Sequence, residues 1–209
     1  MKTITILVVL AIVGLAAGAV FIYSGVYNIG ADEPHWPLVF KAIDTLRDRS
    51  VAAHSREIQQ VPNLQDPKLI AEGAEHYSAM CTGCHLAPGM EDSEIRAGLY
   101  PKPPNFSESS DGTPAEQFWI IKHGVKLTAM AAWGRTHNDD AIWGLVAFVQ
   151  QLPGMTPEAY AAATGRESGD AGHHHHHAEE SAEPEQGASD EGHDGTPQDA
   201  GGRHTDHHH

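Results

Sequence analysis

The stretch "AMCTGCHLAPGM", residues 79–90, contains both cysteines of the 209-residue chain, Cys81 and Cys84, and places His85 directly after them. A Cys-x-x-Cys pair alone is compatible with a redox dithiol, half of a zinc site or the attachment of a haem. A zinc site of this type needs two further ligands at matching spacing, and the chain has no second cysteine pair. A thioredoxin-like dithiol needs strands around it, whereas the flanking sequence has a helical pattern.

The complete pattern Cys-x-x-Cys-His indicates covalently attached haem. Each thiol can add to one vinyl group of the porphyrin, which gives two thioether bonds. The histidine that follows at once is then placed under the iron as an axial ligand. We therefore expect one haem c, held by Cys81 and Cys84, with His85 bound to its iron.

The sequence around this motif predicts helices and no strands, so the expected fold is all-α. Asp66 is a helix cap with Pro67 at the first helical position, and this helix should run to about Cys81. The segment 85–112 is rich in proline and glycine, which predicts an irregular loop. Further helices are expected at 114–123, ended by Gly124, at about 139–152, capped by Asn138 or Asp139, and as a short turn in "TPEAYAAA" at 156–163.

These features together resemble class I c-type cytochromes over about residues 67–153. Gly73, Tyr77 and Cys81 are spaced four residues apart, on one face of a helix. In that family a glycine and an aromatic on the first helix pack against the last helix, so the resemblance implies that Gly73 and Tyr77 meet Leu145 and Phe148. Residues 36–62 also resemble the segment before the haem domain in membrane-anchored bacterial monohaem cytochromes.

The resemblance also implies the remaining haem contacts. Met130 lies 45 residues after His85 and ahead of the last helix, where family members place a methionine as the sixth iron ligand. His123 is an alternative ligand, and Ala131 stands where many relatives have proline. Pro104, in "KPPNF", is expected to accept a hydrogen bond from His85 Nδ1 through its carbonyl. Other residues are candidates for covering the porphyrin or for pairing with its propionates: Trp119, Trp133 and Trp143, and Lys122 and Arg135.

The chain begins with an apolar run from Ile4 to Tyr23 in which only Thr5 is polar. About 20 such residues span a bilayer as a helix, so residues 1–24 are expected to form an uncleaved membrane anchor. A cleaved signal peptide is the alternative, because Ala17-Gly18-Ala19 has the small residues of a cleavage site. With Lys2 in the cytoplasm, the protein would cross the inner membrane once and expose the haem domain to the periplasm. Residues 25–65 are expected to hold a helix from about 37 to 57 and a linker, and residues 66–163 the haem domain.

Residues 164–209 differ in composition from the rest of the chain. They contain eleven acidic residues and two arginines, within a formal net charge of −15 for the whole chain, and no large apolar residue, which predicts disorder. Clustered imidazoles bind Cu, Ni or Zn, and a solvated low-complexity tail or a purification tag are the alternatives. The candidate tail ligands are His173, His174, His175, His176, His177, His207, His208 and His209.

The acidic composition argues against binding to nucleic acid, whose phosphates require Lys and Arg. No general base or nucleophile is evident, so we assign no catalytic residue and expect no enzyme activity. The expected function is the transfer of single electrons between membrane or periplasmic redox partners, either as a separate carrier or as a fixed haem subunit of a larger oxidoreductase. Two alternatives remain open: a haem-based sensor or peroxidase-like protein with a labile sixth ligand, and a metal-handling protein in which the histidine-rich tail is primary.

Overall fold

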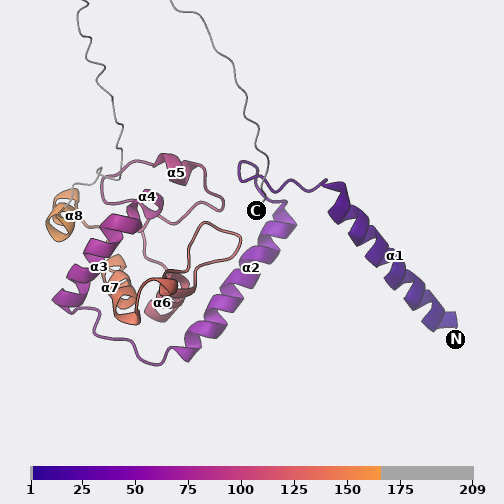
Figure 1. The fold of residues 1–209 in the computed structure, drawn as a ribbon, viewed down its shortest axis with the longest axis horizontal. Helices are drawn as coiled ribbons and strands as arrows, with labels where there is room; N and C mark the ends of the chain where they lie inside the picture. The colour runs from indigo at the N-terminus through magenta and orange to yellow at the C-terminus, as the bar shows by residue number, and fades with distance from the viewer. Residues whose placement is uncertain (1, 166–209) are drawn as a thin grey trace, which may run out of the picture. The chain divides into compact units, whose positions relative to one another are not determined.

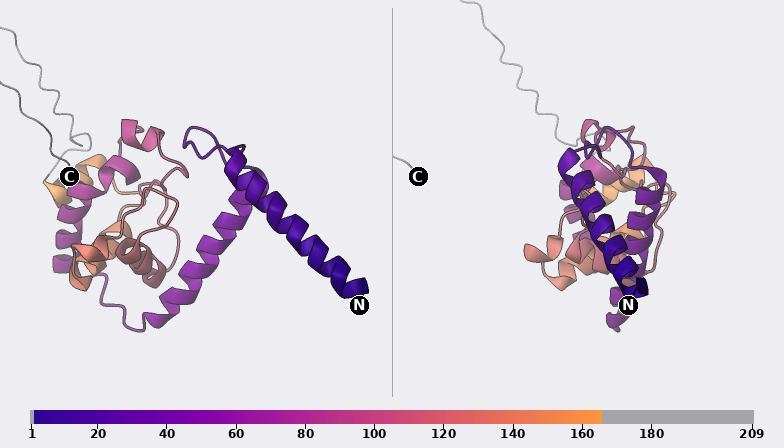
Figure 2. Two further views of the ribbon diagram at one scale, coloured as in Figure 1. Left: turned by 45° about the vertical axis from the view of Figure 1, so that its right-hand side comes forward. Right: turned by 90° about the vertical axis from the view of Figure 1, so that its right-hand side faces the viewer.

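The computed structural model describes residues 2–165, and this part of the chain contains helices and loops but no strand. The predicted all-α fold is confirmed. Figure 1 shows α3, α4, α6, α7 and α8 gathered in one bundle, and the same grouping is visible in both views of Figure 2. The histidine-rich tail lies outside the described residues.

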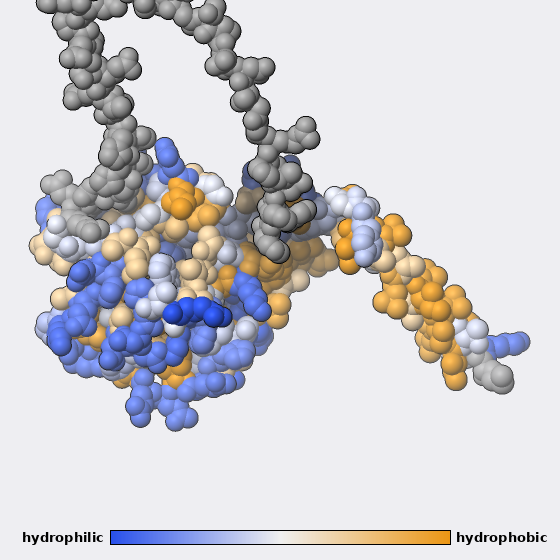
Figure 3. All heavy atoms as spheres, in the orientation of Figure 1, coloured by the Kyte–Doolittle hydropathy of each residue, from blue (hydrophilic) through white to orange (hydrophobic). Residues whose placement is uncertain are grey.

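Helix α1 runs from Lys2 to Ser24, as the apolar run predicts. None of its residues is buried, and Figure 3 shows the helix covered with apolar side chains. Its length of 23 residues is sufficient to cross the hydrocarbon layer of a bilayer. Helix α1 is therefore a candidate membrane anchor.

Helix α2 (Pro37–His54) and the 3₁₀ turn η1 (Ser55–Glu57) occupy the segment where one helix was expected at 37–57. Pro37 begins the helix, which suits a residue without a backbone N–H. The carboxyl end of α2 packs on the bundle, because Val51 and Ser55 are buried and both α2 and η1 contact α6 (Pro114–His123).

The bundle is built on the contact between α3 (Pro67–Met80) and α7 (Asp139–Val149), which is the largest helix pair in the described residues. Both helices begin as predicted: the Asp66 carboxylate accepts a hydrogen bond from Lys68 N at 2.9 Å, and the Asn138 side chain accepts one from Ala141 N at 2.9 Å. Helix α7 ends at Val149, earlier than expected, and the chain reaches Pro153 through turns that keep Leu152 buried.

The expected contacts between α3 and α7 are present. The rings of Tyr77 and Phe148 lie 5.5 Å apart, centre to centre. The partner of Gly73 is not an aromatic side chain, because Gly73 lies against the backbone of Gly144 and the adjoining Leu145 N. The two helices can approach this closely only because both residues lack a side chain.

Two other segments differ from expectation. The one-turn helix α4 (Thr82–His85) continues from the predicted helix end to the start of the predicted irregular loop, and the one-turn helix α5 (Glu94–Ala97) lies within that loop. Helix α8 (Pro157–Thr164) is two turns long rather than a single turn, and its Tyr160 is buried in the main core cluster. The sequence signal for α8 is weak because its alanines show no apolar periodicity. Helix α8 packs against α3, and its buried Tyr160 stabilises this contact.

Candidate haem-binding site

The Cys-x-x-Cys-His motif lies at the end of α3, where the chain continues into α4. Cys81 N donates to Tyr77 O at 2.9 Å, and His85 N donates to Cys81 O at 2.8 Å, so helical geometry extends through the motif. Helical spacing brings residues three apart to the same side, which places both cysteines side by side. Cys81 and Cys84 are both unbonded thiols and both half-buried. Burial, and to a lesser extent the neighbouring Cys84, raises the pKa of the Cys81 thiol to about 12.

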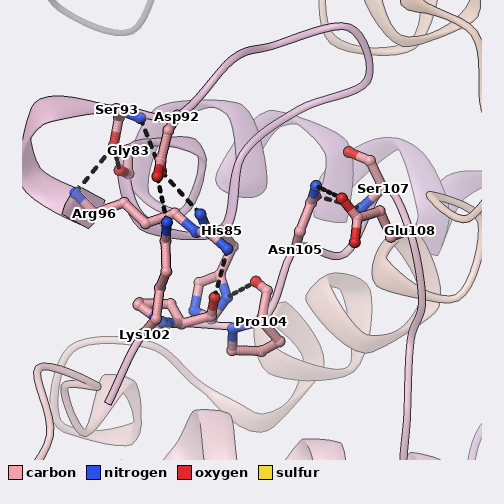
Figure 4. Close-up of polar contacts among 11 residues, drawn as sticks. Gly83, His85, Asp92, Ser93, Arg96, Lys102, Pro104, Asn105, Ser107 and Glu108 are labelled. Carbon is pink, nitrogen blue, oxygen red and sulfur yellow. Dashed lines mark hydrogen bonds and ion pairs between the residues drawn. The ribbon is translucent and has the colours of Figure 1, made fainter. Parts of the chain in front are cut away.

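His85 is held in one orientation by two neighbours. Its Nδ1 lies 3.0 Å from the carbonyl oxygen of Pro104, and its ring stacks on Phe106 with the ring centres 4.6 Å apart. A carbonyl can only accept a hydrogen bond, so Nδ1 carries the proton and the lone pair of Nε2 is free to bind a metal. The hydrogen bond expected between His85 and Pro104 is therefore present (Figure 4).

Burial lowers the pKa of His85, the hydrogen bond to the Pro104 carbonyl opposes this effect, and the positive charge of Arg96 adds to it. The neutral imidazole, which is the form that binds metal ions, is thereby favoured. The segment that carries the ring is fixed as well, because Phe106 N donates to His85 O at 3.3 Å.

Comparison with protein families decides between the possible uses of such a motif. Residues 68–149 match the family model described as "Cytochrome C oxidase, cbb3-type, subunit III". This chain contains a class I c-type cytochrome domain. Searches of curated proteins and of solved structures found no match. The family implies a covalently bound haem c and a general role in electron transfer, either as a carrier or as an oxidase subunit.

In this cytochrome domain, α5 connects the haem-attachment motif to the proline segment that orients His85 (Figure 4). The hydroxyl of Ser93 donates to Gly83 O, within the motif, and accepts from Arg96 N at 3.1 Å. Arg96 then donates through one terminal nitrogen to Pro103 O at 3.0 Å, next to Pro104. The short helix therefore contacts the chain both before and after His85 in this site.

The acidic partner in this brace is Asp92. Its carboxylate pairs with Arg96 at 2.8 Å and with Lys102. Hydrogen bonds from Lys102 and then Arg96 lower the pKa of Asp92 to about 2. Sequence reasoning missed this cluster, although the spacing of Asp92 and Arg96 by four residues is the signal of an ion pair on a helix.

The cytochrome domain also contains a donor that fits the acidic groups of a haem. The Arg96 side chain is 12% exposed, and its Nε–H is buried without a hydrogen-bond partner in the described part of the chain. A buried donor left unpaired costs free energy, and a haem propionate is a suitable acceptor. The two propionate candidates from the sequence are placed differently: Lys122 pairs with Asp139 at 2.7 Å, and Arg135 is exposed. Two thiols, a free imidazole nitrogen and an unpaired guanidinium N–H therefore fit the cofactor.

The loop that carries Met130 is closed by short-range hydrogen bonds. Val125 N donates to Met130 O at 3.1 Å, and Met130 N donates to Thr128 Oγ1 at 3.0 Å. Gly124 packs on this turn so closely that a Cβ there would lie 2.7 Å from Met130 O, and its φ of 66° favours glycine. The turn is therefore closed by hydrogen bonds and by Gly124 packing, with Ala131 following Met130.

Two further methionines and the alternative ligand His123 have other neighbours. Met90 and Met155 pack against the core cluster that contains Tyr77 and Phe148. The ring of His123 lies 5.0 Å from that of Trp119, and its side chain is exposed. These positions favour Met130 as the sixth ligand, which remains a prediction.

The three tryptophans have different surroundings. Trp143 stacks on Phe118 with the ring centres 4.2 Å apart and belongs to a second core cluster with Ile142 and Val146. Trp119 and Trp133 are only partly buried. Trp143 therefore packs in the core, and its expected place over the porphyrin stays a prediction.

Proposed function

We propose that this protein is a membrane-anchored monohaem cytochrome that passes single electrons between redox proteins. The observation that carries the proposal is the 3.0 Å contact between His85 Nδ1 and Pro104 O beside two unpaired thiols. This arrangement leaves one imidazole nitrogen free for iron while both attachment groups are adjacent to it. The match of residues 68–149 to a c-type cytochrome family supports the same conclusion.

When bound, the haem supplies a reversible Fe(II)/Fe(III) couple, and the protein residues set the conditions for it. Cys81 and Cys84 would hold the porphyrin through thioether bonds, and His85 and Met130 would be the ligands of its iron. Histidine with methionine gives a higher potential than two histidines. Arg96 adds a positive charge near the axial histidine, which favours the reduced state.

The membrane position rests on α1 and the aromatic residues after it. The ring of Trp36 lies 6.1 Å from Phe21 and 5.1 Å from Tyr27, centre to centre. Such aromatic groups suit the interface of a bilayer. We propose a single pass through the inner membrane with Lys2 in the cytoplasm and the cytochrome domain in the periplasm, where it meets an electron donor and an acceptor protein.

The proposed binding of Cu, Ni or Zn by the tail concerns residues outside the described part of the chain. The eight candidate histidines are residues 173–177 and 207–209. Within residues 2–165, no group of three or more His, Cys, Asp or Glu side chains is arranged to hold a metal ion.

Haem attachment is tested by mass spectrometry of the protein produced with a periplasmic cytochrome c maturation system. We expect the mass of one haem added to the chain, and a pyridine haemochrome spectrum typical of two thioether bonds. Cys84→Ala should give the spectrum of a single thioether bond. If the wild-type chain gains no haem under these conditions, the proposed function is wrong.

The sixth ligand is tested with Met130→Ala, and Met155→Ala serves as the matched control because Met155 is partly buried against the core cluster. Wild-type ferric protein should show the weak red absorption band of methionine ligation. Met130→Ala should lose this band and bind CO and cyanide readily, whereas Met155→Ala should keep it. Ready CO binding by the wild-type protein would instead favour a haem-based sensor.

A further inference from the structure

Two histidines that the cytochrome domain does not use lie side by side on its surface. His76 is on α3, and His137 follows the 3₁₀ turn η2 (Trp133–Arg135) just before α7. Their ring centres are 5.3 Å apart and their planes are inclined by 85°. Both side chains are half-buried, so each remains accessible from solvent.

The hydrogen bonds of His137 leave one ring nitrogen available. The hydroxyl of Thr136 donates its single proton to Trp133 O at 3.3 Å and lies 2.9 Å from His137 Nδ1. When Nδ1 carries the ring proton, it donates to the hydroxyl oxygen, and the lone pair of Nε2 is then available to a metal ion. No hydrogen bond is found for either ring nitrogen of His76 in the described part of the chain.

The two rings are held by rigid elements. His76 is one turn after Gly73, the point where α3 touches the backbone of Gly144 on α7. The ring of His137 also lies edge-on to Trp133, with the ring centres 5.5 Å apart. The spacing between the imidazoles is therefore set by the tightest helix contact of the domain and by the turn before α7.

We propose that His76 and His137 together bind one divalent transition-metal ion of the imidazole-preferring class, Zn²⁺ or Cu²⁺. Metal–nitrogen bonds of about 2.0–2.1 Å in a tetrahedral arrangement place two imidazole centres about 5 Å apart, close to the observed spacing. Neutral imidazole suits Zn, Cu and Ni. No third acidic, Cys or His ligand joins the pair within residues 2–165, so water completes the coordination.

An ion at this position would connect the two segments that carry the proposed iron ligands. Helix α3 leads through Cys81 into α4, which ends at His85, and η2 begins three residues after Met130. The bound ion would hold the Met130 segment against α3. This consequence rests on the proposed ligation of iron by Met130, whereas the binding of the ion itself does not.

The binding is tested on the full-length, haem-loaded protein with Zn²⁺, which has no redox chemistry of its own. Carbethoxylation of each histidine is measured by mass spectrometry with and without the metal. We expect Zn²⁺ to protect both His76 and His137 in the wild type, and His76→Ala to abolish the protection of His137. If neither residue is protected, or if His137 stays protected in His76→Ala, the two rings do not share an ion.

A second measurement uses thermal unfolding, where an ion that binds only the folded state raises the midpoint. The Zn²⁺-induced rise of the midpoint should be smaller in His76→Ala and in His137→Ala than in the wild type. In the double variant the rise should be no smaller than in either single variant, because one ion needs both rings. The matched control is His54→Ala, which removes another histidine from the described surface and should leave the rise unchanged. The tail is identical in all these proteins, so its histidines cannot account for a difference. Equal rises in all variants would overturn the proposal.

Discussion

Gly73 of α3 and Gly144 of α7 touch through their backbones: a Cβ placed on Gly73 would lie 1.9 Å from Gly144 O and 2.3 Å from its carbonyl carbon. A Cβ on Gly144 would meet Leu69 O at 3.1 Å, which is tight but less severe. The contact is between backbones, so no side-chain rotation can relieve a clash at Gly73. This crossing positions the end of α3, and with it the haem-attachment motif.

Gly73→Ala is therefore expected to destabilise the haem-loaded protein by at least about 3 kcal/mol, the upper end of ordinary overpacking, or to prevent its maturation. Gly144→Ala should cost less. The matched control is Gly98→Ala, where a Cβ would meet its nearest atom at an ordinary 3.8 Å. Denaturant unfolding monitored by far-UV circular dichroism measures the three free energies. Equal stability of the Gly73 and Gly98 variants would contradict the close crossing.

Much of this fold could be predicted from the sequence because its signals are local. Three helix ends have a local signal, either a side-chain cap or a glycine with positive φ. The structure places helix ends at all three: Asp66 with Pro67 before α3, Asn138 before α7, and Gly124 after α6. The contact of Tyr77 with Phe148 could be predicted from the family resemblance, because family members place an aromatic residue where the first and last helices cross.

The parts that were missed depend on contacts between distant segments. Helix α5 exists where Ser93 and Arg96 bond to Gly83 and Pro103, and neither bond has a periodic signature in the sequence. The burial of Tyr160 likewise depends on α8 returning to α3. Sequence spacing identifies the residues that can bind a haem, whereas the groups that support them become visible only after folding.

Tyr77 supports the attachment motif through its hydroxyl, which donates to Leu86 O at 2.7 Å. The side chain is fully buried, and Leu86 has an unfavourable φ of 63° that this bond helps to maintain. Tyr77→Phe leaves the carbonyl without this partner and should cost about 1–3 kcal/mol. Tyr100→Phe is the control, because its hydroxyl accepts a longer 3.2 Å bond in a partly buried position.

The same tyrosine predicts a dependence on alkaline pH. Burial raises the pKa of Tyr77 above its ordinary value of 10.0. Above about pH 10 the unfolded chain loses the phenolic proton while the folded protein keeps it, so the free energy of unfolding should fall as pH rises. Tyr77→Phe should flatten this decline in unfolding experiments between about pH 9 and 11. An unchanged slope would show that other groups cause the decline.

Asp92 predicts a dependence on acid pH with the opposite sign. Its pKa is lowered from 3.8 to about 2, so the stabilisation it gives is complete above about pH 4 and is lost as pH falls toward 2. Asp92→Asn should lower the midpoint of thermal unfolding at pH 6. It should also reduce the difference between the midpoints measured at pH 6 and at pH 2.5. Glu91→Gln, the exposed neighbouring acid, is the matched control. If both variants retain the wild-type pH dependence, the Asp92 cluster does not stabilise the domain.

Arg96 is expected to influence the reduction potential of the haem. Its guanidinium donates to Pro103 O at 3.0 Å, and its charge contributes to the lowered pKa of His85, so it acts on the proposed iron ligand through position and through charge. Arg96→Gln removes the positive charge that disfavours the ferric state, and the midpoint potential should fall. A tenfold change in the reduction equilibrium corresponds to about 59 mV for one electron, and we expect a decrease of that order.

The control is Arg49→Gln on the exposed surface of α2. It removes the same charge without contact to the site and should leave the potential within a few millivolts of wild type. Redox titration of the haem-loaded variants, with the red absorption band as a check that the iron ligands are retained, measures both effects. Equal potentials for the two variants would show that Arg96 only braces the loop.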